Sequence, residues 1–96
     1  MEISSKQRAV LRAQSHHLKP IVVIGKNGLT PGALGSVNSA LEAHELIKVQ
    51  SKHQRPKVLA ESITEALGCD VVGSIGSVVI LFRESPDPDK RKYSEI

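Results

Sequence analysis

The 96-residue sequence predicts a two-layer α/β domain of the α+β type, built on a four-stranded mixed sheet. Three observations predict this class. Short apolar runs of strand length alternate with segments of helical periodicity, in the order α-β-α-β-α-β-β. Strand–helix–strand units favour parallel strands joined by right-handed crossovers. Finally, Gly76-Ser77 separates the last two apolar runs and suits a two-residue hairpin turn, which adds an antiparallel strand.

The first helix and the first strand precede residue 25. A serine, Ser4 or Ser5, can cap a helix that runs to about Gln14. Pro20 then precedes Ile21–Ile24, four β-branched residues in succession. Such a run is typical of a strand that pairs in parallel and is buried on both faces, so we expect both faces of this strand to be covered.

The middle of the chain carries a second helix and a second strand. Thr30 is a good N-cap and Pro31 suits the first helical position, so a helix begins here and ends near Ala43. Its inward-facing residues recur at helical spacing: Leu34, Val37 and Leu41. Leu46–Ser51 alternates apolar and polar residues and is predicted to be the second strand.

The last third of the chain predicts a helix, two strands and a tail. Pro56 begins the helix and Gly68 ends it in the left-handed conformation. The apolar stripe of this helix consists of Val58, Leu59, Ile63 and Leu67. The third strand begins at Asp70, and Val78–Phe82 is the fourth. We therefore expect residues 1–83 to form one domain and residues 84–96, rich in proline and charge, to form a flexible tail that buries nothing.

Charge is distributed unevenly along the chain. Residues 1–57 hold nine Lys or Arg and three acids, a net charge of +6, whereas residues 58–96 carry a net charge of −3. A basic first half points to a polyanionic partner, of which nucleic acid is the commonest. The alternative is that this charge only keeps a small domain in solution.

Aromatic residues are almost absent, which bears on how RNA would be bound. Phe82 and Tyr93 are the only two aromatic residues. Modules that read single strands usually stack bases on several exposed rings. We therefore expect contacts to phosphates and sugars through backbone amides and cations.

The segment Gly25-Lys26-Asn27-Gly28 is the strongest candidate for such contacts. It lies between a predicted strand and a capped helix, whose first N–H groups carry a partial positive charge that suits phosphate. Glycines let a bulky partner approach the main chain, and Lys26 adds a mobile cation. The alternative is a tight strand-to-helix turn with a solvated lysine. Two further G-x-x-G patterns lie in less favourable contexts, one inside the second helix at 32–35 and one at the hairpin at 73–76.

Three blocks of the sequence together resemble a known family. Leu18–Thr30, containing Lys19-Pro20-Ile21-Val22-Val23-Ile24-Gly25-Lys26-Asn27-Gly28, is similar to the signature of the CRM domain, named for chloroplast RNA splicing and ribosome maturation. His44–Val49 resembles a second family block, and Gly73–Arg83 resembles the family's final hairpin. The resemblance covers roughly residues 4–83, and it is closest to the stand-alone bacterial YhbY-like members.

The resemblance implies a four-stranded mixed sheet with helices on one face, similar to the C-terminal domain of translation initiation factor three. It also implies RNA binding, for bacterial members to ribosomal RNA in precursors of the large subunit, by a non-enzymatic ribosome assembly factor. Carried onto this chain, the RNA-binding residues are Gly25, Lys26, Asn27 and Gly28. Charge and expected proximity add Lys19, Lys48, Lys52, Arg55 and Lys57. In the tail, acids dilute the basic run at 90–92, so we expect no strong role for it.

The remaining candidate residues favour structural roles. The four histidines fit no zinc spacing, and we expect no metal and no cofactor. Glu42 and Glu45 are interpreted as a solvated helix end, and His44 as the last residue of that helix. The single cysteine, Cys69, is interpreted as a small buried hydrophobe at a strand start rather than a nucleophile.

The same sequence leaves three function classes to weigh. The leading one is a cytoplasmic RNA-binding monomer without a membrane segment or a small-molecule substrate, since neither an apolar span nor a signal peptide is recognisable. The alternative is a translation-factor-like module that contacts the ribosome through protein. An enzyme acting on nucleic acid is a third class, against which the missing acidic or metal-binding cluster counts.

Overall fold

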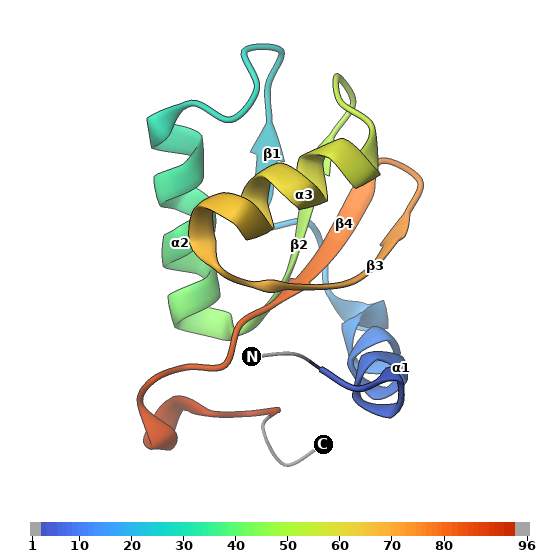
Figure 1. Cartoon of the computed structure of the whole chain (residues 1–96), viewed down its shortest axis with the longest axis vertical. Helices are drawn as coiled ribbons and strands as arrows, with labels where there is room; N and C mark the ends of the chain where they lie inside the picture. The colour runs from blue at the N-terminus through green and yellow to red at the C-terminus, as the bar shows by residue number, and fades with distance from the viewer. Residues whose placement is uncertain (1–2, 94–96) are drawn as a thin grey trace.

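The computed structural model describes residues 3–93, and these form three α-helices, four strands and two short 3-10 helices (Figure 1). In chain order the elements are α1 (Ser5–Gln14), η1 (Ser15–His17), β1 (Val22–Ile24), α2 (Pro31–His44), β2 (Leu46–Ser51), α3 (Pro56–Leu67), β3 (Asp70–Ile75), β4 (Val78–Phe82) and η2 (Pro88–Lys90). The sheet has the order β1-β2-β4-β3; β1 is parallel to β2, and the other neighbouring pairs are antiparallel. The predicted α+β class, element order and mixed sheet are confirmed.

Local sequence signals explain where the helices begin and end. The Ser4 hydroxyl accepts the Gln7 amide at 3.1 Å while the Gln7 side chain accepts the Ser4 amide at 2.8 Å, which forms a capping box. The Thr30 hydroxyl accepts the Ala33 amide at 3.1 Å and caps α2 in the same way. Gly68 ends α3 with φ +65°, in the left-handed conformation that glycine adopts without strain.

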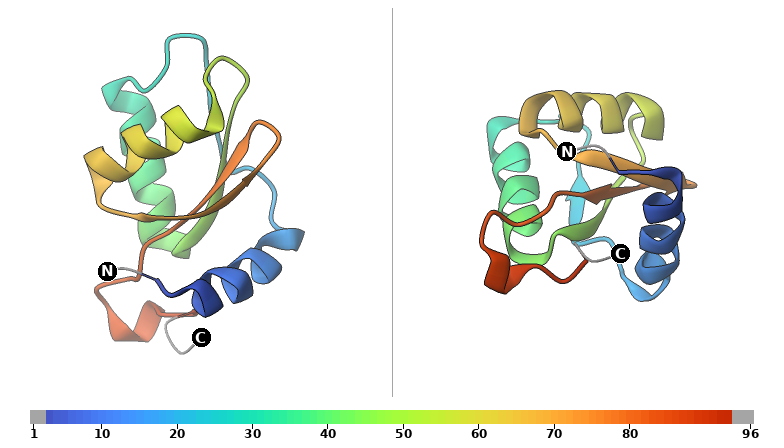
Figure 2. Two further views of the ribbon diagram at one scale, coloured as in Figure 1. Left: turned by 45° about the vertical axis from the view of Figure 1, so that its right-hand side comes forward. Right: turned by 60° about the horizontal axis from the view of Figure 1, so that its bottom comes forward.

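The two faces of the sheet bury different apolar clusters, because successive strand residues point to opposite faces. Helices α2 and α3 cover one face, where Ile47 and Val49 of β2 pack with Leu41 and Leu59. Helix α1 lies on the other face, where Leu11 packs with a cluster that includes Leu46, Ile80 and Phe82. The expectation that the helices share one face is therefore wrong for α1. Figure 2 shows the sheet between α1 and the other two helices.

Helix α1 covers only part of its face, and this overturns two burial predictions. Strand β1 is an edge strand, and Val23 is 69% exposed and Ile21 48% exposed, so Ile21–Ile24 is not buried on both faces. The reason is that α1 packs against β3, at the opposite edge of the sheet. On α3, Val58 is 48% exposed and lies outside the buried stripe, whereas Leu59 and Ile63 are fully buried.

The segment after β4 differs from the expectation that it buries nothing. Its described part, residues 84–93, contains η2 and a buried serine, Ser85. The carboxylate of Glu45 accepts the Ser85 amide at 2.6 Å and the Lys92 amide at 2.5 Å. Glu45 is only 1% exposed, so the prediction of a solvated helix end is wrong for Glu45, although Glu42 is exposed. The domain boundary after residue 83 and the flexibility of the tail stay predictions, and residues 94–96 lie outside the described part.

Candidate nucleic-acid interface

The Gly25–Gly28 loop is a compact turn that projects from one end of the sheet. The Gly28 amide donates to the Gly25 carbonyl at 3.0 Å, and the Thr30 amide donates to the Gly28 carbonyl at 3.0 Å. Gly28 has φ +72°, so this turn requires the left-handed conformation there. Gly25, Lys26 and Asn27 are exposed, and among residues 3–93 no hydrogen bond or ion pair engages the Lys26 side chain. The loop is thus closed by its own backbone and its cation is available to a ligand.

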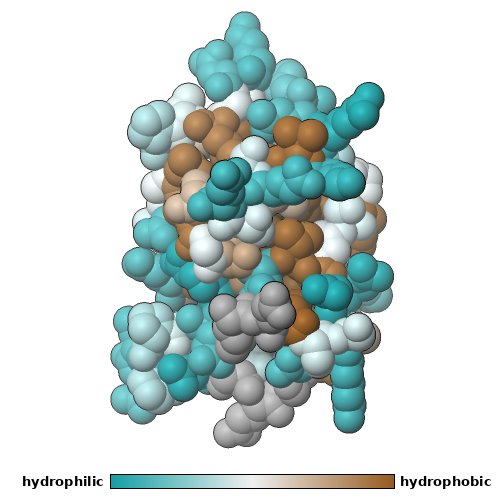
Figure 3. Space-filling model, in the orientation of Figure 1, coloured by the Kyte–Doolittle hydropathy of each residue, from teal (hydrophilic) through white to brown (hydrophobic). Residues whose placement is uncertain are grey.

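A second loop, residues 52–55, lies beside it. Both loops follow the carboxyl ends of β1 and β2, which are parallel neighbours with Ile24 opposite Ser51. A Cβ built on Gly28 lies 3.3 Å from the Gln54 side-chain nitrogen, so the two loops touch. Lys52 and Arg55 are exposed on this second loop. Figure 1 shows both loops at the top of the view, and Figure 3 shows that hydrophilic residues dominate there.

Helix geometry reinforces the positive charge at this end. Helices α2 and α3 both begin here, each with proline in its first turn and no acidic residue in that turn. The partial positive charges of the two N-termini therefore add to those of the side chains. Four cations, which we call the loop-end cluster, are exposed at this end: Lys26, Lys52, Arg55 and Lys57.

Two of the predicted site residues lie elsewhere. Lys48 is the third residue of β2 and points to the face opposite α2 and α3, where its Nζ donates to the Leu18 carbonyl at 3.0 Å. Lys19 directly follows Leu18 and is exposed. Both lysines line one pocket beyond the loop-end cluster, so the predicted set divides into two groups.

Gln54 is a candidate that the sequence did not reveal. Its side-chain oxygen is buried and has no hydrogen-bond partner among the described residues, while its nitrogen lies next to Gly28. Buried acceptors without donors are uncommon in folded proteins. Because this oxygen is not accessible to solvent, Gln54 contributes to the site through its contact with Gly28, which joins the two loops. A glutamine in a loop carries no pattern that marks it in the sequence.

Other residues weighed as candidates are structural. Cys69 packs against the core cluster between α3 and β3, and burial raises the pKa of its thiol to about 11 although the nearby Arg83 opposes the shift. A thiol of such high pKa is a poor nucleophile at neutral pH. His44 is the last residue of α2, as predicted. Residues 3–93 contain no group of three His, Cys, Asp or Glu able to hold a metal, and no helix in that range is long and apolar enough to cross a membrane.

Comparisons with known proteins agree on one family. The CRS1 / YhbY (CRM) domain model matches residues 3–83. A probable RNA-binding protein of Pseudomonas aeruginosa is 33% identical over 93 residues, which cover 94% of this chain and 89% of the relative. A probable RNA-binding protein of Bacillus subtilis is 34% identical over 88 residues, with coverages of 88% and 92%. The solution structure of a Staphylococcus aureus protein matches with a TM-score of 0.81 at 33% identity, covering 96% of this chain and 99% of that one.

Proposed function

Because the chain belongs to the CRS1 / YhbY (CRM) domain family, we propose that it binds RNA and that the glycine loop contacts the sugar–phosphate backbone. Relatives that span nearly the same length are named RNA-binding proteins, which supports the first part of this proposal. The geometry of the loop end supports the second part. The chain acts by binding rather than by catalysis.

One observation carries the proposal. Residues 25–34 and 52–60 form the two loops and the first helical turns at this end, and they contain no aspartate or glutamate. The loop-end cluster and two helix N-termini therefore face solvent together without a compensating acid. Such a surface attracts phosphate, which makes the largest sequence-independent contribution to RNA affinity.

The glycines determine how closely the RNA backbone can approach. No atom lies within 4 Å of a Cβ built on Gly25, so space around the turn is open. Thr30 occupies the Ala33 amide, and Pro31 has no N–H. The amide of Gly32, at the second helical position, is among those without a carbonyl partner in the helix. We propose that the Gly32 amide and Lys26 bind a phosphate, and that Asn27 contacts a sugar or a base edge.

We further propose ribosomal RNA, in a precursor of the large subunit, as the cytoplasmic partner of a monomeric chain. Exposed stacking rings are absent from the loop end, so backbone contacts must dominate, and these suit a strand exposed on a structured RNA that is bound without reading its bases. Crosslinking in cells followed by sequencing of the contacts tests this choice. Contacts enriched in large-subunit precursors support it, and contacts scattered over messenger RNA contradict it.

Lys26→Glu tests the loop assignment, with Lys90→Glu as the matched control. Both lysines are exposed and both changes reverse one charge, but Lys90 lies in η2, away from the loop. We expect Lys26→Glu to weaken RNA binding roughly tenfold, and the slope of log affinity against log salt to fall by about 0.7 for a single strand. Fluorescence anisotropy measures the affinity, and circular dichroism checks the fold. A folded Lys26→Glu variant with the affinity of Lys90→Glu would refute the assignment.

An exposed apolar surface favours a second candidate function, a module that binds a ribosomal or other protein. Val23 and Ile75 are 69% and 55% exposed and lie in one row across the sheet, joined through Gln50 and Val78. The two side chains stand on opposite edge strands with the half-buried Gln50 and Val78 between them, and apolar surface on one face of a sheet can take part in a protein contact. Binding to a purified ribosomal protein, lost in Val23→Asp and unaffected by ribonuclease, would favour this module over an RNA-binding protein.

A further inference from the structure

A pocket of about 280 Å³ lies at the other end of β2 from the glycine loop. Its ionisable side chains come from separate elements, and among the described residues none is acidic. The polar and aromatic lining consists of His17, Lys19, His44, Lys48, Lys92 and Tyr93. A concave site whose described lining has three lysines, two imidazoles and no carboxylate suits an anionic ligand.

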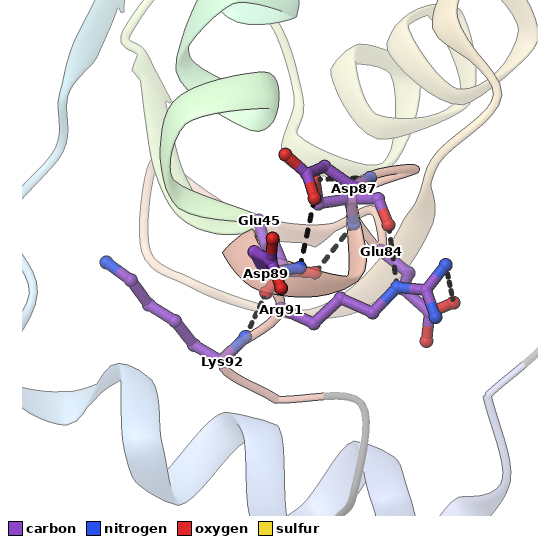
Figure 4. Close-up of polar contacts among 7 residues, drawn as sticks. Glu45, Glu84, Asp87, Asp89, Arg91 and Lys92 are labelled. Carbon is purple, nitrogen blue, oxygen red and sulfur yellow. Dashed lines mark hydrogen bonds and ion pairs between the residues drawn. The ribbon is translucent and has the colours of Figure 1, made fainter.

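The pocket depends on a contact between distant parts of the chain. Glu45 accepts the Ser85 and Lys92 amides, and the Arg91 guanidinium donates to the Ser85 carbonyl at 2.8 Å (Figure 4). These bonds place the Lys92 side chain and the Tyr93 ring at the pocket wall, where Tyr93 also packs edge-to-face on Phe82. The negative charge of Glu45 is occupied by two amides and does not line the pocket.

Lys48 keeps hydrogen-bonding capacity for a ligand. Its Nζ makes one bond, to the Leu18 carbonyl at 3.0 Å. An ammonium group has three N–H donors, so two remain. Because the Leu18 bond fixes the position of the ammonium group, Lys48 presents these donors with less loss of side-chain entropy than a free lysine.

A shallow surface joins this pocket to the glycine loop. It runs along the outer side of edge strand β1 and helix α2 and shares Ile21 and His44 with the pocket. Its α2 residues other than His44 are small and begin at Gly32, shortly after the loop; those in the middle are Gly35, Ser36 and Ser39. A Cβ built on Gly35 meets no atom within 4 Å, so the absence of a side chain at Gly35 does not serve packing against another element of the described chain. None of the described residues that line this surface is acidic either.

We propose that the pocket binds a phosphate of the same RNA strand that the glycine loop holds, so that a single strand runs along the β1–α2 edge between the two sites. The inference rests on the proposed RNA binding, and it adds a second contact point and the path of the RNA between the two points. Strand β2 alone spans roughly 17–20 Å at about 3.3 Å per residue, so a mononucleotide cannot reach both sites. The C-terminal segment, where the sequence predicts no strong role, supplies the pocket with Lys92.

The test compares two pairs of charge reversals that leave the Glu45 contacts intact. The pocket pair is Lys19→Glu with Lys92→Glu, and the control pair is Lys6→Glu with Lys90→Glu. All four lysines are exposed, and neither control lysine lines the pocket or the surface beside α2. Lys92 bonds Glu45 through its backbone amide, which the substitution preserves. Thermal unfolding followed by circular dichroism verifies that both variants fold.

Oligouridines of about 4 and about 12 nucleotides are the probes, together with uridine monophosphate. We expect the pocket pair to weaken binding of the longer strand roughly tenfold more than the control pair, and to affect the shorter strand no more than the control does. The imidazole resonances of His17 and His44 should shift when the longer strand is added to the unaltered chain.

The outcomes separate failure of this inference from failure of the proposed function. Equal losses for the pocket and control pairs, with binding still sensitive to Lys26→Glu, overturn the second site and leave the loop assignment standing. If Lys26→Glu also has no effect, the proposed function itself fails. Binding of uridine monophosphate that depends on the pocket lysines, without an effect on the longer strand, identifies a free-nucleotide site and overturns the shared strand.

Discussion

The two ends of β2 are held by different kinds of contact. At the end where Ser51 lies, the neighbouring glycine loop is held by bonds between residues two or three positions apart, such as Gly25 and Gly28, and its cations stay exposed. Before Leu46, the buried carboxylate of Glu45 binds amides 40 and 47 positions downstream. The first end therefore leaves its donors available to a ligand, whereas the second uses its acceptor to fix the chain.

The largest expected effect concerns the Glu45 end of the sheet, where Cys69 lies just before β3. Burial raises the pKa of its thiol from 9.0 to about 11. Since only the thiolate reacts, alkylation by iodoacetamide at about pH 8 should be roughly a hundredfold slower than for a free cysteine, and should speed up as the pH rises. Mass spectrometry of timed samples measures the rate, with denatured chain as the control. A rate equal to that of the denatured chain would show that this end is open to solvent.

The next effect in size is that of Glu45→Gln. The amide retains one acceptor oxygen, so one of the two backbone amides loses its partner and faces an NH₂ group. Hydrogen bonds to a charged group contribute about 2 kcal/mol, equivalent to roughly a thirtyfold change in the equilibrium for releasing the segment. Glu45 has φ +63°, and glutamine shares the backbone strain of glutamate there, so the comparison isolates the carboxylate.

Trypsin measures this release, because three of its cleavage sites lie together at residues 90–92. We expect Glu45→Gln to be cut there much faster than the unaltered chain under native conditions, since cleavage tracks the population of the opened segment. Cleavage at the unaltered rate would mean that other contacts hold the segment.

The contrast between the two ends also explains what the sequence could predict. Ser4, Thr30 and Gly68 act on neighbours a few positions away, and each helix boundary that they mark is confirmed. Gly76 begins the predicted hairpin turn with φ +57°, for the same reason. Such signals require only the local backbone.

The failures concern contacts between distant segments. The role of Glu45 depends on Ser85 and Lys92, and no local pattern marks a pairing across 40 residues. The exposure of Val23 depends on which strands of the sheet α1 packs against. Lys48 is separated from the loop-end cluster because its position in β2 sets which face it occupies. The turn at residues 25–28 was predictable from its glycines, but its contact with Gln54 and the grouping of cations around it were not.

At the glycine-loop end, Gly28→Ala should have a smaller effect than the loss of the Glu45 carboxylate. Alanine at φ +72° in the left-handed region costs about 1 kcal/mol, and its Cβ lies 3.3 Å from the Gln54 nitrogen. Urea denaturation measures the change in the free energy of unfolding. Gly25→Ala is the matched control, because its Cβ meets no atom within 4 Å and we expect almost no change in stability. Equal destabilisation by both substitutions would contradict the special role of the Gly28 conformation.

The smallest expected effect is that of Glu84→Gln, which removes a carboxylate from the same C-terminal segment. Glu84 pairs with Arg91 at 3.5 Å, but the side chains are 26% and 33% exposed, so solvent screens the attraction. We expect a change below about 0.5 kcal/mol and almost no increase in trypsin cleavage at residues 90–92. Glu84→Gln makes the same chemical change as Glu45→Gln, and it lies on the segment that Glu45 binds. Comparing the two variants therefore separates the effect of a buried carboxylate from the effect of charge alone. If the two variants were cleaved equally fast, general charge balance rather than the buried carboxylate would hold the segment, and the two ends of β2 would not differ as the structure indicates.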